Sequence, residues 1–484
     1  MRNLSSRTII AIGLFCVMTA IASSAQTFNV LFTFDKINGY GPLAPLIQGT
    51  NGHFYGATPQ GAANGGGAIF DMIPSGQMAG GYSFCALANC EDGRQTYAPL
   101  LQSTNGNFVG VTTEGGSSCE SGALCGTFFE LTSAGKLTTL YNFCSLPNCA
   151  DGYYPAIAPL EVSGNFYGAI SFGGANGGGL IYELAADGTF SSRYAFCSQT
   201  NCSDGSNPIG LVHGTNGNFY GTTIFGGTNQ YGTIFAITPA GRLTTLYNFT
   251  GSGGDANASS MLQANNGNFY GTTLNLNNYE GEIFELTNTG KFTILYNFCP
   301  LNCQPKLSDP GAMIQGSDGN FYGIAGSGGA NGNGGIFKMT PAGKVTTYLS
   351  FPACGYQSDC PSGFGPGGLL QGTDGNFYGV MDGGGWEPCF NLVGCGTVYK
   401  VTTGIPPFVT PYPNYGKVGS LMRLIGNGLT GATNVTFNGT RAVFNVVSDT
   451  YITATVPTGA TSGVIEVTTP TGSMKSNVAF KVPR

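Results

Sequence analysis

The chain has 484 residues, of which only 9% are charged and 41% are hydrophobic. Its net charge of −6 is small for this length and it shows no basic patch, which argues against nucleic acids and anionic membranes as partners. The hydrophobic content argues against disorder, and 80 glycines between short runs of Thr, Phe, Tyr, Val and Ile indicate an all-β protein with many turns.

Residues 1–25 have the pattern of a secretory signal peptide. Arg2 and Arg7 precede an uncharged, mostly apolar run at 9–21, and small residues follow up to a cleavage point before Gln26. The run is shorter than the roughly 20 residues that a membrane-spanning helix needs. The sequence therefore predicts a protein that is secreted or held at the cell surface, or released into the periplasm, without insertion into the membrane.

A short aromatic motif recurs seven times in the body of the chain, at intervals of 50 to 58 residues. The copies are NGHFYG at 51, NGNFVG at 105, SGNFYG at 163, NGNFYG at 216 and 266, and DGNFYG at 318 and 374.

Each copy of the motif belongs to a unit with four strand-like runs. One unit contains PIGLVHG from residue 208, NFYGTTI from 218, GTIFAIT from 232 and RLTTLYNF from 242. Turns rich in Asn-Gly or Ala-Gly separate the first run from the second and the third from the fourth, which is typical of hairpins. Four antiparallel strands in about 50 residues predict one blade of a β-propeller.

The strand count also predicts how the ring closes. The third run of the seventh unit, GTVYKVT at 396–402, is followed by Gly404-Ile405-Pro406-Pro407 and by no fourth run. A spare run of the fourth type, TFNVLFTF at 27–34, stands at the start of the mature chain. We therefore expect a seven-bladed β-propeller over 26–404, closed by the N-terminal strand so that no sheet edge stays open.

The repeated units, for example MIQGSDGNFYG with GGIFKMTPAGKVTTYLSF before residue 352, resemble the GloVer tandem repeats of exported proteins from Gram-negative bacteria. The resemblance covers roughly 27–404 and implies no established activity. Within 405–484, the segments VGSLMRLIGNGLTGATNVTFNG and ITATVPTGATSGVIEVTTPTG resemble IPT/TIG domains. That second resemblance implies an Ig-like β-sandwich, which usually serves as a spacer or interaction module.

Removal of the signal peptide leaves fourteen cysteines in seven close pairs. Equivalent loops carry both cysteines of a pair or neither, which indicates that the two partners bond to each other. Zinc thiolates are the alternative, but the chain has no C-x-x-C pair and only two His. We predict local disulfides made in an oxidising compartment, namely Cys85–Cys90, Cys119–Cys125, Cys144–Cys149, Cys197–Cys202, Cys299–Cys303, Cys354–Cys360 and Cys389–Cys395.

In an up-and-down blade, the second-to-third and fourth-to-first connections share one face of the ring. Here they hold every long loop and every cysteine pair, so we expect the binding site on this face. Aromatic rings in these loops are candidates for stacking on sugars, and their alternative role is packing beneath the loops. The candidate ligand-binding residues are Trp386, Tyr153, Tyr154, Tyr231 and Tyr279.

Carboxylates in the same loops are candidates for the acid and base of glycoside cleavage, with solvated loop charge as the alternative. These catalytic candidates are Glu114, Glu280, Asp382 and Glu387. The Asp that recurs at 92, 151, 204 and 309 is expected instead to form a turn or to bond the next blade, because a catalytic residue is needed only once. His53 and His213 belong to different blades, so no metal site is expected, and no cofactor is implied.

Two functions remain open at this stage. The first is a monomeric binding protein of the cell exterior that presents its propeller loops to a glycan or a surface protein. The second is an extracellular carbohydrate-active enzyme, either a glycoside hydrolase or a polysaccharide lyase, with carboxylates or tyrosines at the mouth of the propeller channel.

Overall fold

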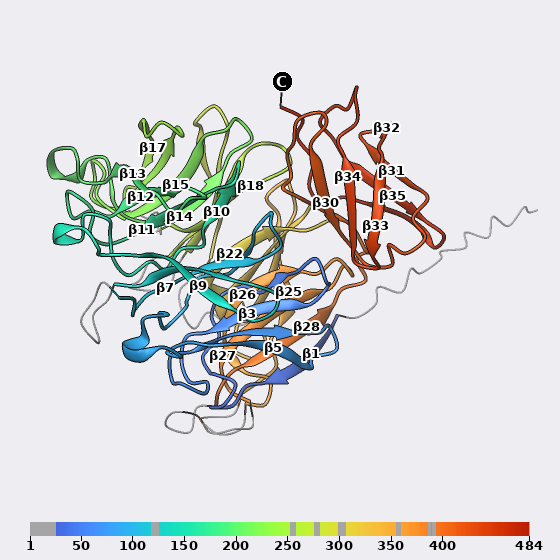
Figure 1. Ribbon diagram of the computed structural model, residues 1–484, viewed down its shortest axis with the longest axis horizontal. Coiled ribbons are helices and arrows are strands. Elements are labelled where there is room, and N and C mark those ends of the chain that lie inside the picture. Colours follow the sequence, from blue (N-terminus) through green and yellow to red (C-terminus); the bar gives the residue numbers. More distant parts are fainter. Residues whose placement is uncertain are drawn as a thin grey trace, which may run out of the picture.

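The computed structural model describes residues 26–117, 125–251, 258–274, 281–298, 306–354, 360–385, 389 and 394–483. Seven four-stranded antiparallel sheets follow one another along the chain and form the blades of a propeller (Figure 1). Two further four-stranded sheets form an Ig-like sandwich, drawn in red. The seven-bladed propeller followed by an Ig-like module is thus confirmed.

Blades 1 to 6 are each built from four consecutive strands. Blade 1 contains β2 (Ile47–Gln48), β3 (Phe54–Thr58), β4 (Ala68–Met72) and β5 (Met78–Ser83). Blade 2 contains β6 (Leu101–Gln102), β7 (Phe108–Thr112), β8 (Thr127–Leu131) and β9 (Leu137–Asn142). Blade 3 contains β10 (Leu160–Val162), β11 (Asn165–Ile170), β12 (Leu180–Leu184) and β13 (Phe190–Ala195).

Blades 4 to 6 have the same order. Blade 4 contains β14 (Ser206–His213), β15 (Phe219–Phe225), β16 (Thr233–Ile237) and β17 (Leu243–Asn248). Blade 5 contains β18 (Ala258–Gln263), β19 (Phe269–Leu274), β20 (Gly281–Leu286) and β21 (Phe292–Asn297). Blade 6 contains β22 (Leu307–Gln315), β23 (Phe321–Gly328), β24 (Gly335–Met339) and β25 (Val345–Ser350).

Blade 7 joins the two ends of the repeat region. Its first three strands are β26 (Phe364–Gln371), β27 (Phe377–Gly383) and β28 (Thr397–Thr402), and its fourth is β1 (Thr27–Thr33). β1 runs antiparallel to β28, from the pair Thr27 and Thr402 to the pair Thr33 and Thr397. The predicted closure by the N-terminal strand is therefore confirmed.

The aromatic motif explains why neighbouring blades pack. Its Tyr lies against the Phe of the next blade, so that one ring pair occupies most junctions. The ring centroids are 4.0 Å apart for Tyr55–Phe108, 4.6 Å for Tyr167–Phe219, 4.2 Å for Tyr220–Phe269, 4.4 Å for Tyr270–Phe321, 4.6 Å for Tyr322–Phe377 and 4.2 Å for Tyr378–Phe54. The last pair crosses from blade 7 to blade 1. Blade 2 has Val109 in place of Tyr, and there Phe128 packs on Phe166 instead.

The glycine of the motif makes room for the third strand of its own blade. A Cβ at Gly221 would lie 2.5 Å from Cζ of Phe235, and a Cβ at Gly110 would lie 2.6 Å from Cζ of Phe129. Any larger residue at this position would displace a buried ring, because a close-packed protein core leaves no free space. The FYG sequence is therefore a packing signature of the blade.

The first strands of neighbouring blades contact one another, as β14 does with β18 and β18 with β22, and so surround the axis of the ring. At their ends, a side chain of the first strand links its blade to the one before it at six of the seven junctions, through Gln at five and Glu161 at one. Gln102 accepts the N–H of Thr50 (3.0 Å), and Gln48 accepts that of Thr373 (2.9 Å) across the closure. The equivalent bonds are Thr104 N to Glu161 (2.7 Å), Thr215 N to Gln263 (2.9 Å), Asn265 N to Gln315 (2.9 Å) and Ser317 N to Gln371 (2.8 Å).

The sandwich has two facing sheets around a buried core that includes Leu424, Phe437 and Val467. One sheet contains β29 (Thr410–Tyr412), β30 (Leu421–Ile425), β34 (Tyr451–Thr455) and β33 (Phe444–Ser448). The other contains β32 (Thr440–Arg441), β31 (Asn434–Phe437), β35 (Ile465–Thr469) and β36 (Gly472–Lys475).

The sandwich packs on the face of the propeller that carries the tight first-to-second turns, which we call the tight-turn face (Figure 1). Arg423 donates to the carbonyl oxygen of Ser103 in blade 2 (2.9 Å), and its guanidinium lies 4.7 Å from the centroid of Tyr412. Other bonds reach blades 1, 5 and 7: Thr450 to Thr50 O (2.8 Å), Ala479 N to Asn265 (3.1 Å) and Asn427 to Thr373 (2.6 Å). The sandwich therefore contacts the tight turns of blades 1 and 2, which follow the closing strand, and those of blades 5 and 7 at the other end of the repeat region.

Candidate functional site

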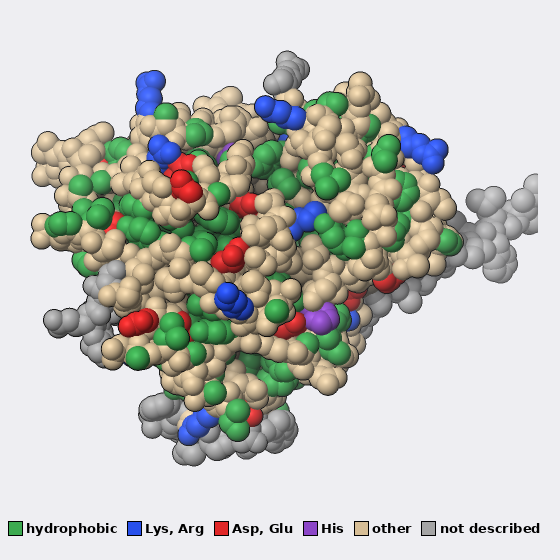
Figure 2. All heavy atoms as spheres, in the orientation of Figure 1, with side chains coloured by type: hydrophobic (Ala, Val, Ile, Leu, Met, Phe, Trp, Pro, Cys, Tyr) green, Lys and Arg blue, Asp and Glu red, His purple; other side chains and the backbone are tan. Residues whose placement is uncertain are grey.

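The opposite side of the ring carries the second-to-third and fourth-to-first connections, and we call it the long-loop face. Three short 3-10 turns lie in these connections, η1 (Ala88–Cys90), η2 (Pro147–Cys149) and η3 (Thr200–Cys202). In the space-filling view, charged side chains are few and scattered over the face that is drawn (Figure 2). Because only 9% of the residues are charged, a ligand of the long-loop face has to be recognised mainly by uncharged groups.

Disulfide bonds close the loops of this face. The structure describes Cys85–Cys90, Cys144–Cys149, Cys197–Cys202, Cys354–Cys360 and Cys389–Cys395. Cys125 is also disulfide-bonded, while Cys119, Cys299 and Cys303 lie outside the described residues. The pairs that the structure describes are those the sequence predicts.

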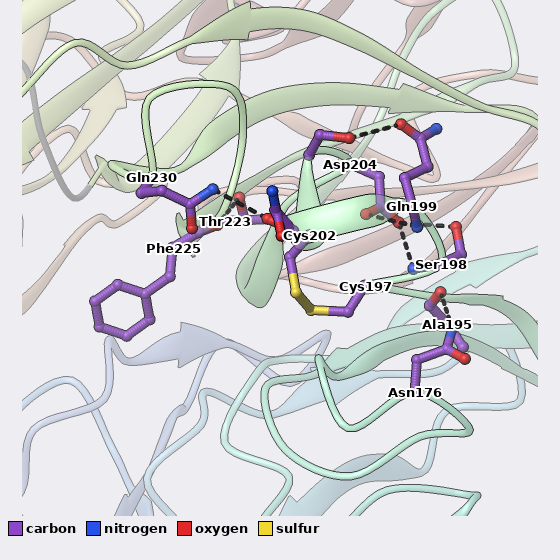
Figure 3. The surroundings of a disulfide bond; sticks show 12 residues. Asn176, Ala195, Cys197, Ser198, Gln199, Cys202, Asp204, Thr223, Phe225 and Gln230 are labelled. Atoms are coloured by element: carbon purple, nitrogen blue, oxygen red, sulfur yellow. Dashed lines mark hydrogen bonds between the residues drawn. A yellow bond between two sulfur atoms is a disulfide. The ribbon is translucent and has the colours of Figure 1, made fainter.

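A buried aspartate organises the disulfide loops of blades 2, 3 and 4. Asp204 is fully buried and accepts hydrogen bonds from the N–H (3.0 Å) and hydroxyl (2.9 Å) of Ser198 (Figure 3). It also accepts one from the hydroxyl of Tyr194 (2.7 Å). Asp92 and Asp151 occupy the same position in their loops. Of the two roles considered for this recurring Asp, the structure therefore shows the turn.

We predict that non-reducing peptide mapping will recover all seven local pairs, including Cys119–Cys125 and Cys299–Cys303. Because each bond closes a short loop, its contribution in the chain-entropy model is about 2 kcal/mol. Reduction should therefore lower the denaturation midpoint while the propeller stays folded, as followed by far-UV circular dichroism. Free thiols in the folded protein, or links between distant blades, would contradict the pairing.

Aromatic rings gather on the long-loop face of blades 3 and 4. Tyr153 stacks on Phe172 with ring centroids 5.6 Å apart, and Tyr154 meets the same ring edge-on at 6.0 Å. Phe172 is 39% exposed, and Phe225, at the equivalent position of blade 4, is 53% exposed. Figure 3 shows the Phe225 side chain pointing away from the disulfide loop beside it. Tyr231 is 48% exposed on the same blade.

In six blades, one residue inside the inner strand or in the segment that leads into it has a left-handed backbone at the channel mouth of this face. The φ values are 72° at Gly41, 59° at Gln95, 57° at Tyr154, 54° at Asn207, 60° at Asp309 and 65° at Gly365. Asp309 belongs to this series and not to the buried aspartates, which lie three residues earlier in their repeats. Its assignment to the recurring turn Asp was wrong, because blade 6 has Lys306 at the position of the buried aspartates.

A pocket of about 420 Å³ opens at the mouth between blades 7 and 1. Its walls include Tyr40, Tyr97, Phe364 and Asp382. Asp382 stays partly exposed in this open pocket, and partial desolvation by the surrounding walls raises the pKa of its carboxyl group. A Cβ at Gly41 would lie 3.2 Å from its Oδ1. Asp382 is therefore the catalytic candidate that the structure places in a pocket.

Glu114 has a different environment. Its carboxylate is mostly buried and forms an ion pair with Arg94, whose backbone also bridges to it. The ion pair and the backbone bridge together hold this side chain in one position. Glu114 is therefore better suited to fixing the loop than to acting as a free base.

The remaining candidates, Trp386, Glu387, Tyr279 and Glu280, lie outside the described residues. The structure also brings two residues to the mouth that the sequence did not single out, Tyr40 and Phe364. They occupy equivalent positions immediately before the left-handed residue of blades 1 and 7. An alignment of the repeats on the left-handed residue would have pointed to Tyr40 and Phe364.

Asp382 also yields a pH prediction. A carboxyl whose pKa is raised by folding stabilises the protein below its unfolded pKa of about 3.9, and this contribution is lost as the pH rises through the folded pKa. Asp382→Asn should therefore match the wild type near pH 3 and be more stable at pH 7, measured by urea denaturation. Lower stability of the variant at pH 7 would show that the charged form is favoured.

Comparisons with known proteins place these features in a family. The Gloeobacter/Verrucomicrobia repeat matches residues 16–162 and 124–310, and the IPT/TIG domain matches residues 407–482. No curated protein matches the chain. Among the described residues, no helix is long and apolar enough to cross a membrane.

Solved structures are similar to the chain at low identity. A luciferin-regenerating enzyme is 14% identical with a TM-score of 0.38, over 62% of this chain and 89% of that one. The extracellular domain of a one component system from B. thetaiotaomicron is 9% identical with a TM-score of 0.48, over 95% of this chain and 58% of that one. A protein of unknown function from Bacteroides thetaiotaomicron VPI-5482 is 14% identical with a TM-score of 0.39, over 71% and 83%.

Proposed function

The chain belongs to the Gloeobacter/Verrucomicrobia repeat family, and we propose that this member is an exported, monomeric protein that binds a glycan on its long-loop face. The observation that carries the proposal is the pair of exposed phenylalanines at equivalent positions of blades 3 and 4, Phe172 and Phe225. The same position holds Gln60 in blade 1, Glu114 in blade 2 and Ser327 in blade 6. Folding of the blade therefore does not require an aromatic residue there.

A glycan suits this surface better than a charged ligand. Flat rings offer apolar faces of the size of a sugar ring, and Tyr hydroxyls at their edges can bond to its substituents. Tyr153 and Tyr154 supply such edges beside Phe172. A surface protein is the other partner that exposed rings can anchor, because interface hot spots are rich in aromatic residues.

Export is the second part of the proposal. The five described disulfide bonds favour an oxidising compartment, since such bonds are rare in reducing ones. The predicted signal peptide at 1–25 would deliver the chain there, with Gln26 as the first mature residue.

We predict that Phe172→Ala and Phe225→Ala will each weaken binding of the preferred glycan about fivefold or more, as expected when an aromatic anchor is truncated. A glycan array identifies the ligand, and titration calorimetry measures the affinities. Trp386→Ala and Tyr154→Ala should act in the same direction if those rings also stack.

The matched control is Ser327→Ala, at the same repeat position of blade 6, which should leave the affinity unchanged. Val443→Ser on the sandwich removes a side chain that is 81% exposed and tests for nonspecific hydrophobic attraction. Equal binding by the wild type and both phenylalanine variants would refute this face as the glycan site. Binding to a surface protein without any glycan signal would favour the other partner.

One observation favours a carbohydrate-active enzyme as the second candidate function. Asp382 lies in the mouth pocket with a raised pKa, as a general acid requires. In that case Asp382→Asn should abolish the release of reducing ends or unsaturated products while glycan binding persists. If the protein only binds the glycan, neither the wild type nor Asp382→Asn will release a product.

A further inference from the structure

The ring of glutamine links at the tight-turn face is interrupted at one junction. Between blades 3 and 4 the donor would be the N–H of Ser163, and the acceptor position is occupied by His213 instead of Gln. His213 forms no hydrogen bond with any residue in the described part of the chain. The N–H of Ser163 instead faces the hydroxyl of Tyr415, a residue of the sandwich. The ring centroids of Tyr415 and His213 are 5.4 Å apart.

The interruption coincides with a second irregularity. The turn of blade 3 is one residue shorter than its counterparts, with β10 and β11 joined by Ser163-Gly164. Both departures face the same space, a cavity of about 700 Å³ between blades 3 to 5 and the sandwich. This volume lies within the range of small-molecule sites, which runs from about 300 to 1,000 Å³.

Apolar side chains form part of the walls of the cavity, including Val162, Val212, Val478 and Val482. Several polar side chains on the walls already have partners. Asn265 bonds to the sandwich backbone through both ends of its amide, and Gln263 bonds to Thr215 and Gly267. Ser462 accepts the N–H of Val482, and Asn216 donates to Tyr220.

Two side chains on the walls, Lys481 and His213, can hold an anion by a charge and by a hydrogen bond. Lys481 forms no ion pair with any residue that the structure describes, and burial lowers the pKa of His213, so its imidazole is neutral at pH 7. A cation and a neutral donor beside an apolar wall are complementary to one carboxylate on an apolar body.

We propose that the cavity between the propeller and the sandwich binds a small carboxylic acid with an apolar body, held by Lys481 and His213. The site is on the opposite side of the ring from the long-loop face and is independent of the proposed glycan binding. Keeping His213 costs one hydrogen bond between blades, which is the kind of local conflict that functional sites retain.

Benzoate is the probe, with benzamide as its uncharged counterpart, and ligand-observed NMR with titration calorimetry gives the affinities for the full chain. Benzoate should bind more tightly than benzamide, and Lys481→Met should weaken benzoate about tenfold while leaving benzamide unchanged. His213→Gln restores the residue of the repeat. It should abolish benzoate binding while the thermal midpoint is maintained or rises.

Asp382→Asn on the long-loop face is the control and should leave benzoate affinity unchanged. Thermal melts of each variant separate loss of the site from loss of folding. No binding of benzoate at millimolar concentration, or equal binding of benzoate and benzamide by the wild type and Lys481→Met, would overturn the proposal. An unchanged benzoate affinity in a folded His213→Gln protein would overturn it as well.

Discussion

Phe34→Ala is expected to destabilise the propeller by about 3–5 kcal/mol, the cost of removing a large buried aromatic side chain. Phe34 directly follows the closing strand β1 and is fully buried. Its ring lies 5.1 Å from that of Phe70 in blade 1, and its N–H bonds to the carbonyl oxygen of Gly396 in blade 7 (3.0 Å). The residue thus joins the two blades that the closure brings together.

Urea denaturation followed by far-UV circular dichroism measures the loss in the free energy of unfolding. Val30→Ala on the same strand is the matched control, since Val30 is partly exposed and its truncation should cost less than 1 kcal/mol. Deletion of residues 27–34 should go further and abolish a single cooperative transition, because it leaves an edge of β28 unpaired. A loss below 1 kcal/mol for Phe34→Ala would show that the closure contributes little.

The architecture was predictable because its determinants repeat. Seven copies of one aromatic motif fix the number of blades, and the spare run at 27–34 fixes the closure, since each sheet requires four strands. The motif also encodes its own packing, with Gly221 beneath Phe235 in the same blade and Tyr220 against Phe269 in the next.

The site was less predictable because it depends on which loops meet across blades. The sequence placed Tyr153 and Tyr154 on the long-loop face, but gave no sign that both rings contact Phe172. It also grouped Asp309 with the buried aspartates, although its backbone conformation is that of Tyr154 and Asn207.

The contacts of the sandwich were invisible in the sequence for a related reason. The bonds of Arg423 to Ser103 and of Thr450 to Thr50 join residues more than 300 positions apart, and neither belongs to a repeated pattern. Only residues that depart from the repeat point to such contacts. His213, which replaces the usual Gln, is one such residue, and its ring lies against Tyr415 of the sandwich.

The last prediction compares two ways of holding a loop of the long-loop face. Asp204→Ala removes a buried carboxylate together with the hydrogen bonds that it accepts from Ser198 and Tyr194. The expected cost is about 3 kcal/mol, more than the about 2 kcal/mol expected for replacing Cys197 and Cys202 together by Ala. Tyr194→Phe removes one donor and should cost about 1 kcal/mol.

The reason for this order is that the carboxylate acts in the folded loop, whereas the disulfide mainly restricts the unfolded chain. The connection between β1 and β2 shows that a carboxylate can suffice. It contains no cysteine, and Asp35, which follows Phe34 as Cys197 follows Phe196, accepts the N–H groups of Ile37 (2.9 Å) and Asn38 (2.7 Å). Denaturation midpoints of the Asp204 and double-cysteine variants decide the question. A larger loss from the cysteine variant would make the disulfide the main constraint on the loop.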